Sequence, residues 1–285
     1  MKKVFLSAFA LTIGAIGFAQ VGNTGTVTQT GNENAGIVSQ TGDANNATIT
    51  SDGNRFKNNV GKYGTWRTAG ASGSMMAKGV TQVGDSNTGT ITQAGYTGVT
   101  AGSSSAGIGQ DGNSNKATIT QAEYLTHAWS GQNQAFVDQI GDSNESLQNQ
   151  TGRAGTSYFR QAGNNNYGES QQGSQSSAKL EQEGNRNSST QIQGTQNGQK
   201  SDTYQFGDDN IASSNQSGGL SNESKILQEG ASNNAEVTQV GATNIGNVYQ
   251  TGDNNIGTIS STGINHLGTI TQTGGLNEAI ITQNQ

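Results

Sequence analysis

A glutamine, or a serine in its place, recurs every eleven residues along most of this chain. After each of these positions a Gly follows two residues on, an Asn five on, a small residue seven on and often Ile or Val nine on. The repeated positions are Gln29, Gln40 and Ser51; Gln110 and Gln121; Gln139, Gln150, Gln161 and Gln172; and Gln228, Gln239, Gln250, Ser261, Gln272 and Gln283. A short fixed period of this kind is the signature of a solenoid or fibre, in which each unit packs only against its neighbours.

Each unit predicts a turn followed by a strand. The G-x-x-N segment supplies residues that tolerate positive φ, and the stretch after it alternates with a period of two. Asn115, Ala117, Ile119 and Gln121 share one face of such a stretch, and the residues between them share the other. We expect the Asn, small, aliphatic and Gln face to be the interior, and two strands that face each other to make one rung.

Stacked rungs place identical amide side chains above one another, where they can bond along the stack. The predicted ladder residues are Gln29, Asn34, Gln40, Asn45, Gln82, Asn87, Gln93, Gln110, Asn115, Gln121, Gln139, Asn144, Gln150, Gln228, Asn233, Gln239, Asn244, Gln250, Asn255, Gln272, Asn277 and Gln283. The predicted turn glycines are Gly31, Gly42, Gly84, Gly112, Gly141, Gly230, Gly241 and Gly252.

The spacings indicate how the strands pair. Numbered from Gln20, every odd unit from the third on is eleven residues long, whereas the irregular units from the third on are all even. Because insertions in a solenoid map to loops on one side, one edge is predicted to be constant and the other variable. The long insertions fall at about 54–75, 96–103 and 123–130. Counting from Gln20 to Gln283 gives twenty-two strand units, hence an all-β, cross-β solenoid of about eleven two-strand rungs.

Composition supports a ladder and argues against other classes. The chain has 43 Gly, no Pro, no Cys and 12% charged residues, which does not describe an ordinary globular enzyme. A continuous ladder accepts Pro only at an edge, whereas a disordered chain of this composition would usually contain Pro and more charge. The absence of Cys excludes disulfides and thiolate metal sites.

Residues 1–19 differ from the rest. Lys2 and Lys3 precede the apolar run 4–18, and Gly17 and Ala19 are the small residues of a cleavage site before Gln20. This pattern predicts a secretory signal peptide, and the run is shorter than the roughly twenty residues of a membrane span. Residues 20–285 would form the exported protein, with twelve basic and twenty acidic side chains once Lys2 and Lys3 are removed. That charge argues against nucleic acid as a partner.

The segments Gln40 to Ser51 (QTGDANNATITS) and Gln228 to Gln239 (QEGASNNAEVTQ) closely resemble the curlin repeat. The resemblance covers nearly all of residues 20–285. Curlins are the subunits of curli, the amyloid fibres of bacterial surfaces. The resemblance implies secretion in an unfolded state through a dedicated outer-membrane pore, nucleated assembly at the cell surface, and extracellular fibres that serve biofilm matrix and adhesion. A nucleator subunit and the pore are the implied partners besides the chain itself.

The ends of the repeat array suggest how one copy joins another. The last complete unit, 277–283, and the first strand, 26–29, have the same pattern as the interior units, and a monomeric solenoid needs polar caps instead. Both ends are therefore expected to template another copy. Eleven rungs at about 4.8 Å make a block of roughly 50 Å, to which polymerisation adds blocks end to end.

Acidic residues follow several turn glycines directly. They are Asp43, Asp85, Asp142, Asp208 and Asp253. Two interpretations are equally open: these charges slow premature pairing as gatekeepers, or Gly-Asp is simply favourable turn chemistry. Calcium binding is a weaker third, since the turns lack the Asp-dense nonapeptide that binds it.

The insertions concentrate aromatic and basic residues on the variable edge. The predicted interaction patch consists of Arg55, Phe56, Tyr63, Trp66, Arg67, Tyr96, Tyr124 and Trp129. Exposed aromatic and Arg residues mark interaction sites. Drift of loops on a tolerant surface explains the same residues.

A rival function rests on the outward face of the odd units. Thr26/Thr28, Thr48/Thr50, Thr90/Thr92 and Thr118/Thr120 form four successive T-x-T pairs. A flat array of this kind resembles the ice-binding face of some β-solenoid antifreeze proteins, and a soluble ice-binding or ligand-binding solenoid is the alternative function. Thr is, however, a common outward residue in strands.

Catalysis is not expected. His127 and His266 lie in different regions, and His266 occupies the Asn position of the repeat. The chain has no nucleophile elbow, no HExxH motif and no phosphate-binding loop. Its carboxylates offer no convergent acid and base pair. We therefore predict no enzyme activity, no cofactor and no metal.

Overall fold

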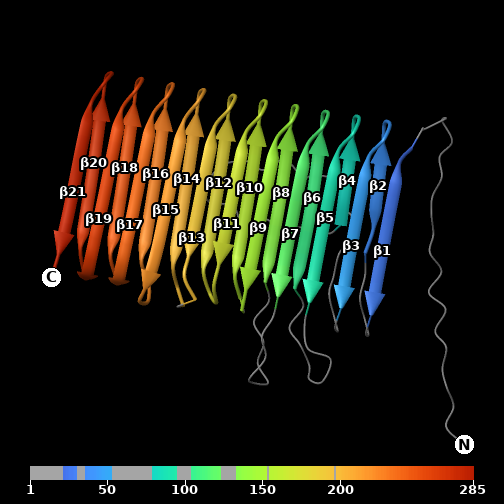
Figure 1. Ribbon diagram of the computed structural model, residues 1–285, viewed down its shortest axis with the longest axis horizontal. Helices are drawn as coiled ribbons and strands as arrows, with labels where there is room; N and C mark the ends of the chain where they lie inside the picture. The colour runs from blue at the N-terminus through green and yellow to red at the C-terminus, as the bar shows by residue number, and fades with distance from the viewer. Residues whose placement is uncertain are drawn as a thin grey trace, which may run out of the picture.

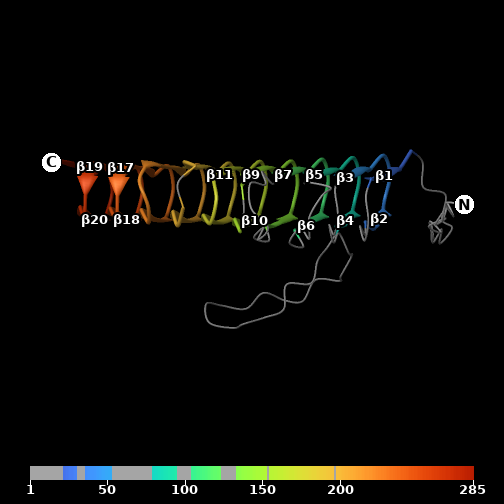
Figure 2. The ribbon, with the colours of Figure 1, turned by 90° about the horizontal axis from the view of Figure 1, so that it is seen from below.

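The computed structural model describes residues 22–30, 36–52, 79–94, 104–122, 133–152, 154–195 and 197–285. Within them the chain forms 21 strands that alternate between two parallel sheets (Figure 1). Turned by 90°, the stack shows its two sheets as two layers (Figure 2). The predicted all-β solenoid with parallel strands in two sheets is confirmed.

The odd-numbered strands form the larger sheet, which has 11 strands. They are β1 (Thr24–Thr30), β3 (Asn46–Asp52), β5 (Thr88–Ala94), β7 (Lys116–Ala122), β9 (Glu145–Thr151), β11 (Tyr167–Gln172), β13 (Ser188–Gln193), β15 (Ile211–Gly218), β17 (Asn234–Ala242), β19 (Ile256–Ile264) and β21 (Glu278–Asn284).

The even-numbered strands form the smaller sheet, which has 10 strands. They are β2 (Val38–Thr41), β4 (Gly79–Val83), β6 (Ser105–Asp111), β8 (Gln134–Ile140), β10 (Thr156–Ala162), β12 (Ser177–Glu183), β14 (Lys200–Phe206), β16 (Glu223–Glu229), β18 (Ile245–Thr251) and β20 (Leu267–Thr273). The count of 21 differs from the twenty-two predicted units because Gln20, the first position counted, lies outside the described residues.

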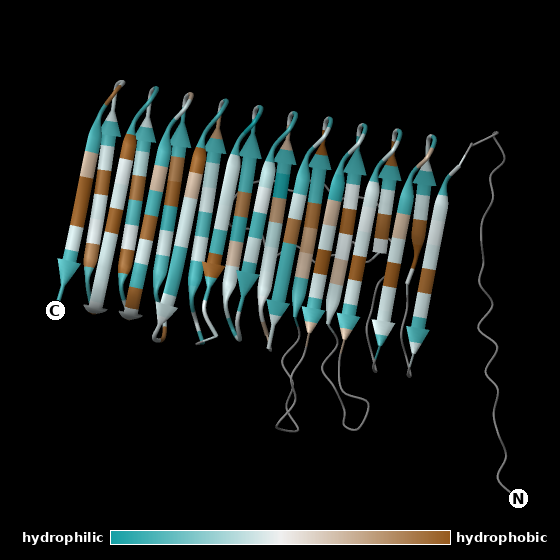
Figure 3. Cartoon of the chain, in the orientation of Figure 1, coloured by the Kyte–Doolittle hydropathy of each residue, from teal (hydrophilic) through white to brown (hydrophobic). Residues whose placement is uncertain are grey.

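The side chains alternate as the period of two predicts. In β7, Ala117, Ile119 and Gln121 are buried, and Thr118 and Thr120 between them are partly exposed. The alternation of apolar and polar residues along the strands is visible in Figure 3. Neighbouring strands of a sheet pair in register, so that Gln121 lies beside Gln150 and Ala117 beside Ser146. Identical positions of successive units are therefore stacked in straight rows.

The turns depart from the prediction in one respect. The turn glycines have positive φ as expected, for example Gly42 at 103° and Gly84 at 101°. The second residue with positive φ is the one before the Asn, such as Ala44 at 54° or Ser86 at 59°, and not the Asn itself. A side chain in this left-handed region is uncommon. It is tolerated here because the following Asn holds the turn through hydrogen bonds to neighbouring rungs.

The apolar interior is divided along the stack. One cluster runs from Ala47 to Val137 and a second from Ala212 to Ile270, with a small cluster around Phe159 between them. In the middle of the larger sheet the aliphatic position is occupied by polar residues, because Ile119 is followed in register by Gln148, Ser170, Gln191 and Ser214 before Val237. Gln191 donates to the carbonyl oxygen of Lys179 at 2.8 Å and to the Thr203 hydroxyl at 2.9 Å, across the interior.

Candidate functional site

An uninterrupted row of glutamine amides runs through the smaller sheet. The Nε2 of each glutamine donates to the Oε1 of the next at 2.7–2.9 Å. The row consists of Gln40, Gln82, Gln110, Gln139, Gln161, Gln182, Gln205, Gln228, Gln250 and Gln272. All bonds point the same way, so the row has a direction, with donors facing the C-terminal end.

Each glutamine also ties the two sheets together. The second hydrogen of the Gln139 amide bonds to the carbonyl oxygen of Lys116 in the facing sheet at 3.1 Å. Gln150 makes the reciprocal bond from the larger sheet to the carbonyl oxygen of Gln134 at 2.9 Å. A buried amide donor without a partner costs about 1–3 kcal/mol. The position therefore selects a side chain with two donors and an acceptor, which is glutamine.

The corresponding row of the larger sheet is less regular. It begins with Ser51, whose hydroxyl contacts the Oε1 of Gln93 at 3.4 Å. From Gln93 it continues through bonds of 2.7–3.3 Å to Gln239. At its far end the shorter Ser261 donates to Gln283 at 3.0 Å. The serines predicted to replace Gln thus occupy the same row, with fewer bonds.

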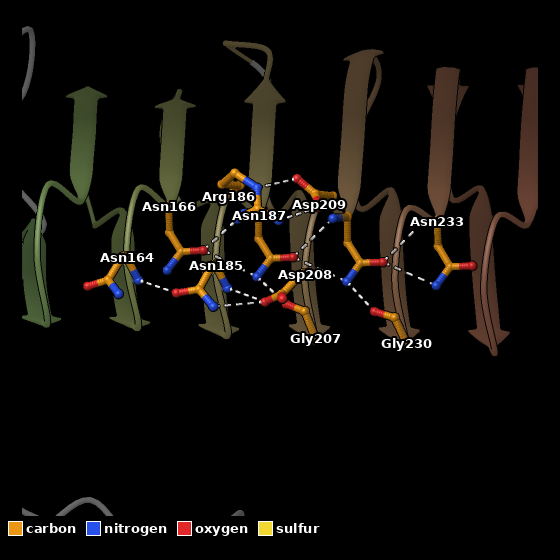
Figure 4. Close-up of polar contacts among 11 residues, drawn as sticks. Asn164, Asn166, Asn185, Arg186, Asn187, Gly207, Asp208, Asp209, Gly230 and Asn233 are labelled. Atoms are coloured by element: carbon orange, nitrogen blue, oxygen red, sulfur yellow. Dashed lines mark hydrogen bonds and ion pairs between the residues drawn. The ribbon is translucent and has the colours of Figure 1, made fainter.

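A row of asparagines follows the edge where even strands lead into odd strands, the edge predicted to be constant. Each Asn Nδ2 donates to the carbonyl oxygen of the turn Gly in the next rung at 2.6–2.9 Å. Each Asn Oδ1 accepts the backbone N–H of the next Asn at 2.9–3.1 Å. Figure 4 shows part of this row, from Asn166 to Asn233. The row comprises Asn45, Asn87, Asn115, Asn144, Asn166, Asn187, Asn210, Asn233, Asn255 and Asn277.

The acidic residues that follow the turn glycines belong to a second row at the same edge. The Oδ1 of Asp85 accepts the backbone N–H of Asp43 at 2.7 Å, and that of Asp142 accepts the N–H of Asn113 at 2.7 Å. Asp208 and Asp253 accept in the same way from Asn185 and Ala231, at 2.7 and 2.8 Å. These carboxylates therefore take part in the turns, which favours the turn interpretation. Beside them, Arg186 and Asp209 form an exposed bidentate ion pair at 2.7 and 2.6 Å.

The asparagine row of the opposite edge is interrupted. Asn222 and Asn244 donate to turn glycines, and Asn244 accepts the backbone N–H of His266 at 3.0 Å. Ser176 and Gln199 occupy the same position earlier in the stack. His266 therefore lies at an Asn position, as its place in the repeat predicts, and its Nε2 lies 3.0 Å from the carbonyl oxygen of Thr262.

The other predicted site residues have different outcomes. Gln29 lies in β1, while Asn34 and Gly31 are outside the described residues. The eight residues of the predicted interaction patch and the three insertions also lie outside them, so the patch stays a prediction. The four T-x-T pairs lie on β1, β3, β5 and β7 and are stacked in register.

An aromatic and charged surface on the smaller sheet was missed by the sequence analysis. Two outward rows run Phe136, Tyr158, Lys179, Asp202, Lys225 and Asp138, Arg160, Glu181, Tyr204, Leu227, Tyr249. Lys179 lies 4.7 Å from the ring centre of Tyr204, and Lys225 lies 5.6 Å from that of Tyr249. Burial raises the pKa of Asp138 to about 6, against the effect of Arg160. These residues come from units 22 or so positions apart, and an alignment of the even units alone would have revealed the rows.

The two ends of the stack are open strand edges. At the C-terminal end β21 pairs only with β19, and β20 only with β18, among the described strands. The inward residues Ala279, Ile281 and Gln283 of β21 are partly exposed. The residues at the same positions of β17, namely Ala235, Val237 and Gln239, are 0% exposed. The end strand therefore has interior side chains without the neighbour that would cover them.

Residues 22–53 match the family model described as the curlin associated repeat. This confirms the resemblance for the segment that contains β1, β2 and β3. No curated protein matches the chain. No helix among the described residues has the length and apolar character needed to cross a membrane.

Proposed function

We propose that this chain is a secreted structural subunit that assembles end to end into extracellular, curli-type amyloid fibres for biofilm matrix and surface adhesion. The curlin associated repeat at residues 22–53 and the two-sheet solenoid support the proposal. In this proposal residues 1–19 direct export, an outer-membrane pore carries the unfolded chain, and a nucleator subunit starts growth. The proposal assigns no catalytic step, cofactor or nucleic-acid partner to the chain.

The observation that carries the proposal is the state of the end strands. β21 has the same Ala, Ile and Gln at its inward positions as the interior strands, yet these side chains are only partly buried. A further strand would cover Ile281 and continue the row that ends at Gln283. Covering apolar surface is favourable, and each added strand also forms backbone hydrogen bonds, which contribute about 1 kcal/mol each. The structure therefore has a surface that its own repeat fits.

Fibre assembly would add one block of about eleven rungs, roughly 50 Å long at about 4.8 Å per rung, with each copy. The internal rows of amide bonds run parallel to this direction of growth. Identical side chains stacked in this way are the general basis of cross-β stability. The repeat that builds the monomer would thus also hold the fibre together.

The test is a thioflavin-T time course on purified residues 20–285, with fibre diffraction on the product. We expect a lag followed by growth, a lag removed by preformed seeds, and reflections near about 4.7 and 10 Å. A soluble monomer that neither seeds nor binds the dye would contradict the proposal.

The register of the threonines favours one alternative, a soluble ice-binding or ligand-binding solenoid. Thr26, Thr48, Thr90 and Thr118 form one straight outward row, and Thr28, Thr50, Thr92 and Thr120 form the other. This function requires thermal hysteresis from a non-fibrillar monomer. Its absence in such a preparation would rule out the ice-binding form.

A further inference from the structure

The two sheets end differently at the C-terminal end of the stack. The larger sheet has 11 strands and the smaller has 10, because β21 has no partner strand across the interior among the described residues. At the N-terminal end β1 and β2 begin the two sheets together (Figure 1). The C-terminal surface is therefore a step one strand high, and the N-terminal surface is not its direct complement.

A second copy can be placed on this step in two ways. If it is only translated, its β1 covers β21, and a gap of one strand remains above β20. If it is also rotated by 180° about the stacking axis, its β1 covers β20 and its β2 covers β21. The strands of the two sheets run in opposite directions (Figure 1). The rotation exchanges the sheets and reverses the strands, so parallel pairing is preserved and no gap remains.

The rotated arrangement joins strands with nearly the same sequence. β20 reads LGTITQT and β1 reads TGTVTQT. In register, Ile270 would lie beside Val27 of the next copy, and Gln272 beside its Gln29. The glutamine row of the smaller sheet would then continue across the junction, in the direction in which the Nε2 of Gln250 donates to Gln272 at 2.9 Å. The outward threonines of β20 would also continue into the T-x-T rows of the next copy.

The other strand pair of this junction matches equally well. Ala279, Ile280, Ile281, Thr282 and Gln283 of β21 would lie beside Gly36, Ile37, Val38, Ser39 and Gln40 of the next copy. Ile280 and Ile37 are outward apolar residues that are 65% and 42% exposed in the single chain. Rotation places them together, whereas translation places Ile280 beside Thr26. The exposed isoleucines thus favour rotation independently of the strand count.

From these observations we infer that successive copies of residues 20–285 stack with a rotation of 180° about the fibre axis, in addition to any twist of the solenoid. The inference rests on the proposed function, since it concerns the junction between fibre subunits. Each junction buries β20 under β1 and β21 under β2 of the next copy. One copy then advances the fibre by about 50 Å, and the fibre repeats after two copies, about 100 Å. The edge that contains the insertions alternates between the two sides of the fibre from copy to copy.

Introduced cysteine pairs distinguish the two junctions, because the chain has no cysteine of its own. Rotation places Thr282 of β21 beside Ser39 of the next copy, and translation places it beside Thr28. In-register neighbours in a sheet are about 4.8 Å apart, which lies within the Cα separation of a disulfide, about 4.4–6.8 Å. We expect oxidised fibres of T282C/S39C to run as covalent multimers on a denaturing gel, and those of T282C/T28C to run as monomers.

A second pair gives the reverse control. T271C/T28C joins β20 to β1, which are neighbours only after rotation, and it should cross-link. Covalent multimers from T282C/T28C with none from the other two pairs would overturn the inference. So would well-formed fibres in which no pair cross-links.

Fibres of the unsubstituted chain provide a measurement free of any effect of the substitutions. Helical reconstruction by electron microscopy should give a rotation near 180° per subunit beyond the twist per rung. A rotation equal to the accumulated twist alone would contradict the inference and leave the proposed function intact. Failure of residues 20–285 to form fibres at all would contradict the proposed function and this inference with it.

Discussion

The side-chain amide of Asn187 donates a 2.7 Å hydrogen bond to the carbonyl oxygen of Gly207, in the turn of the next rung (Figure 4). The Oδ1 of the same side chain accepts the backbone N–H of Asn210 at 3.0 Å. Asn187 is fully buried. One side chain thus satisfies a donor and an acceptor of the backbone in a place that water does not reach, where unpaired backbone groups are costly.

Asn187→Asp tests the donor half of this arrangement. Aspartate keeps the acceptor for Asn210 but removes the donor to Gly207 and places a buried charge against a carbonyl oxygen. We expect a loss of about 3 kcal/mol or more in the free energy of unfolding, as for other uncompensated buried charges. Denaturant unfolding measures it, with Asn254→Asp on the exposed surface of a turn as control. Equal midpoints for the two variants would contradict the role given to the row.

Gly252→Ala and Gly274→Ala separate two costs of the turn glycines. Both residues have positive φ, 108° and 100°, so both substitutions strain the backbone. A Cβ on Gly252 would collide with the carbonyl oxygen of Gly274, whereas a Cβ on Gly274 would find its nearest atom, Asn277 Nδ2, at 3.8 Å. We expect Gly252→Ala to lower stability by about 1–3 kcal/mol more than Gly274→Ala, as measured by thermal or denaturant unfolding. Indistinguishable losses would mean that the turns do not pack as described.

Gly274→Ala should also slow fibre growth, because the turn of the next copy would occupy the space that is open at Gly274 in the single chain. Seeded elongation rates compare it with the unsubstituted chain. An unchanged rate would show that growth does not cover this end.

Ile281→Lys should block the C-terminal end as a growth surface. Ile281 points inward from β21 and is partly exposed, so a lysine there keeps its charge in water in the monomer but would bury it after another strand is added. We expect elongation from seeds to fall by about tenfold or more, since an unpaired buried charge costs several kcal/mol. Thr282→Lys, on the outward side of the same strand, is the matched control. Growth at the same rate in both variants would argue against end-to-end assembly through β21.

Asp208 distinguishes the two interpretations of the acidic turn residues. Its Oδ1 accepts both the backbone N–H and the side-chain Nδ2 of Asn185, at 2.7 and 3.0 Å. Asp208→Asn keeps an acceptor and removes the charge, whereas Asp208→Ala removes both. We expect the Asn variant to retain stability and lag time, and the Ala variant to lose about 1.5–3 kcal/mol, as for a hydrogen bond to a charged group. A much shorter assembly lag in Asp208→Asn would show instead that the charge acts as a gatekeeper.

Asp138 predicts a pH dependence of stability. Burial on the outer face of the smaller sheet raises its pKa from 3.8 to about 6, with Arg160 acting in the opposite direction. The folded chain therefore holds this proton more tightly than the unfolded chain, and the free energy of unfolding falls as the pH rises from about 4 to about 6. Asp138→Asn should raise stability at pH 7 by up to about 3 kcal/mol, the equivalent of two pKa units, and by much less at pH 4. Unfolding curves at the two pH values give this difference, and an equal effect at both would refute the assignment.

Much of the fold could be predicted because its determinants are local. The alternation in 115–121 assigns Ala117, Ile119 and Gln121 to one face whatever surrounds the strand. The eleven-residue period then requires that equivalent residues stack, and the glutamine and asparagine rows follow. The polar stretch of Gln148, Ser170, Gln191 and Ser214 breaks no rule of this pattern, so the periodicity did not reveal a divided apolar interior.

The sequence by itself determined which side chains face inward and that the chain forms a stack of repeats, because strand alternation and turn chemistry act within a few residues. Only the tertiary structure decided which groups these side chains meet. It assigned the second hydrogen of each glutamine to the facing sheet, joined Asp208 to the turn before it, and gathered Tyr158, Arg160 and Tyr204 on one outer face. Such contacts link units about twenty residues apart, and their geometry depends on the register between strands rather than on the sequence of any single unit.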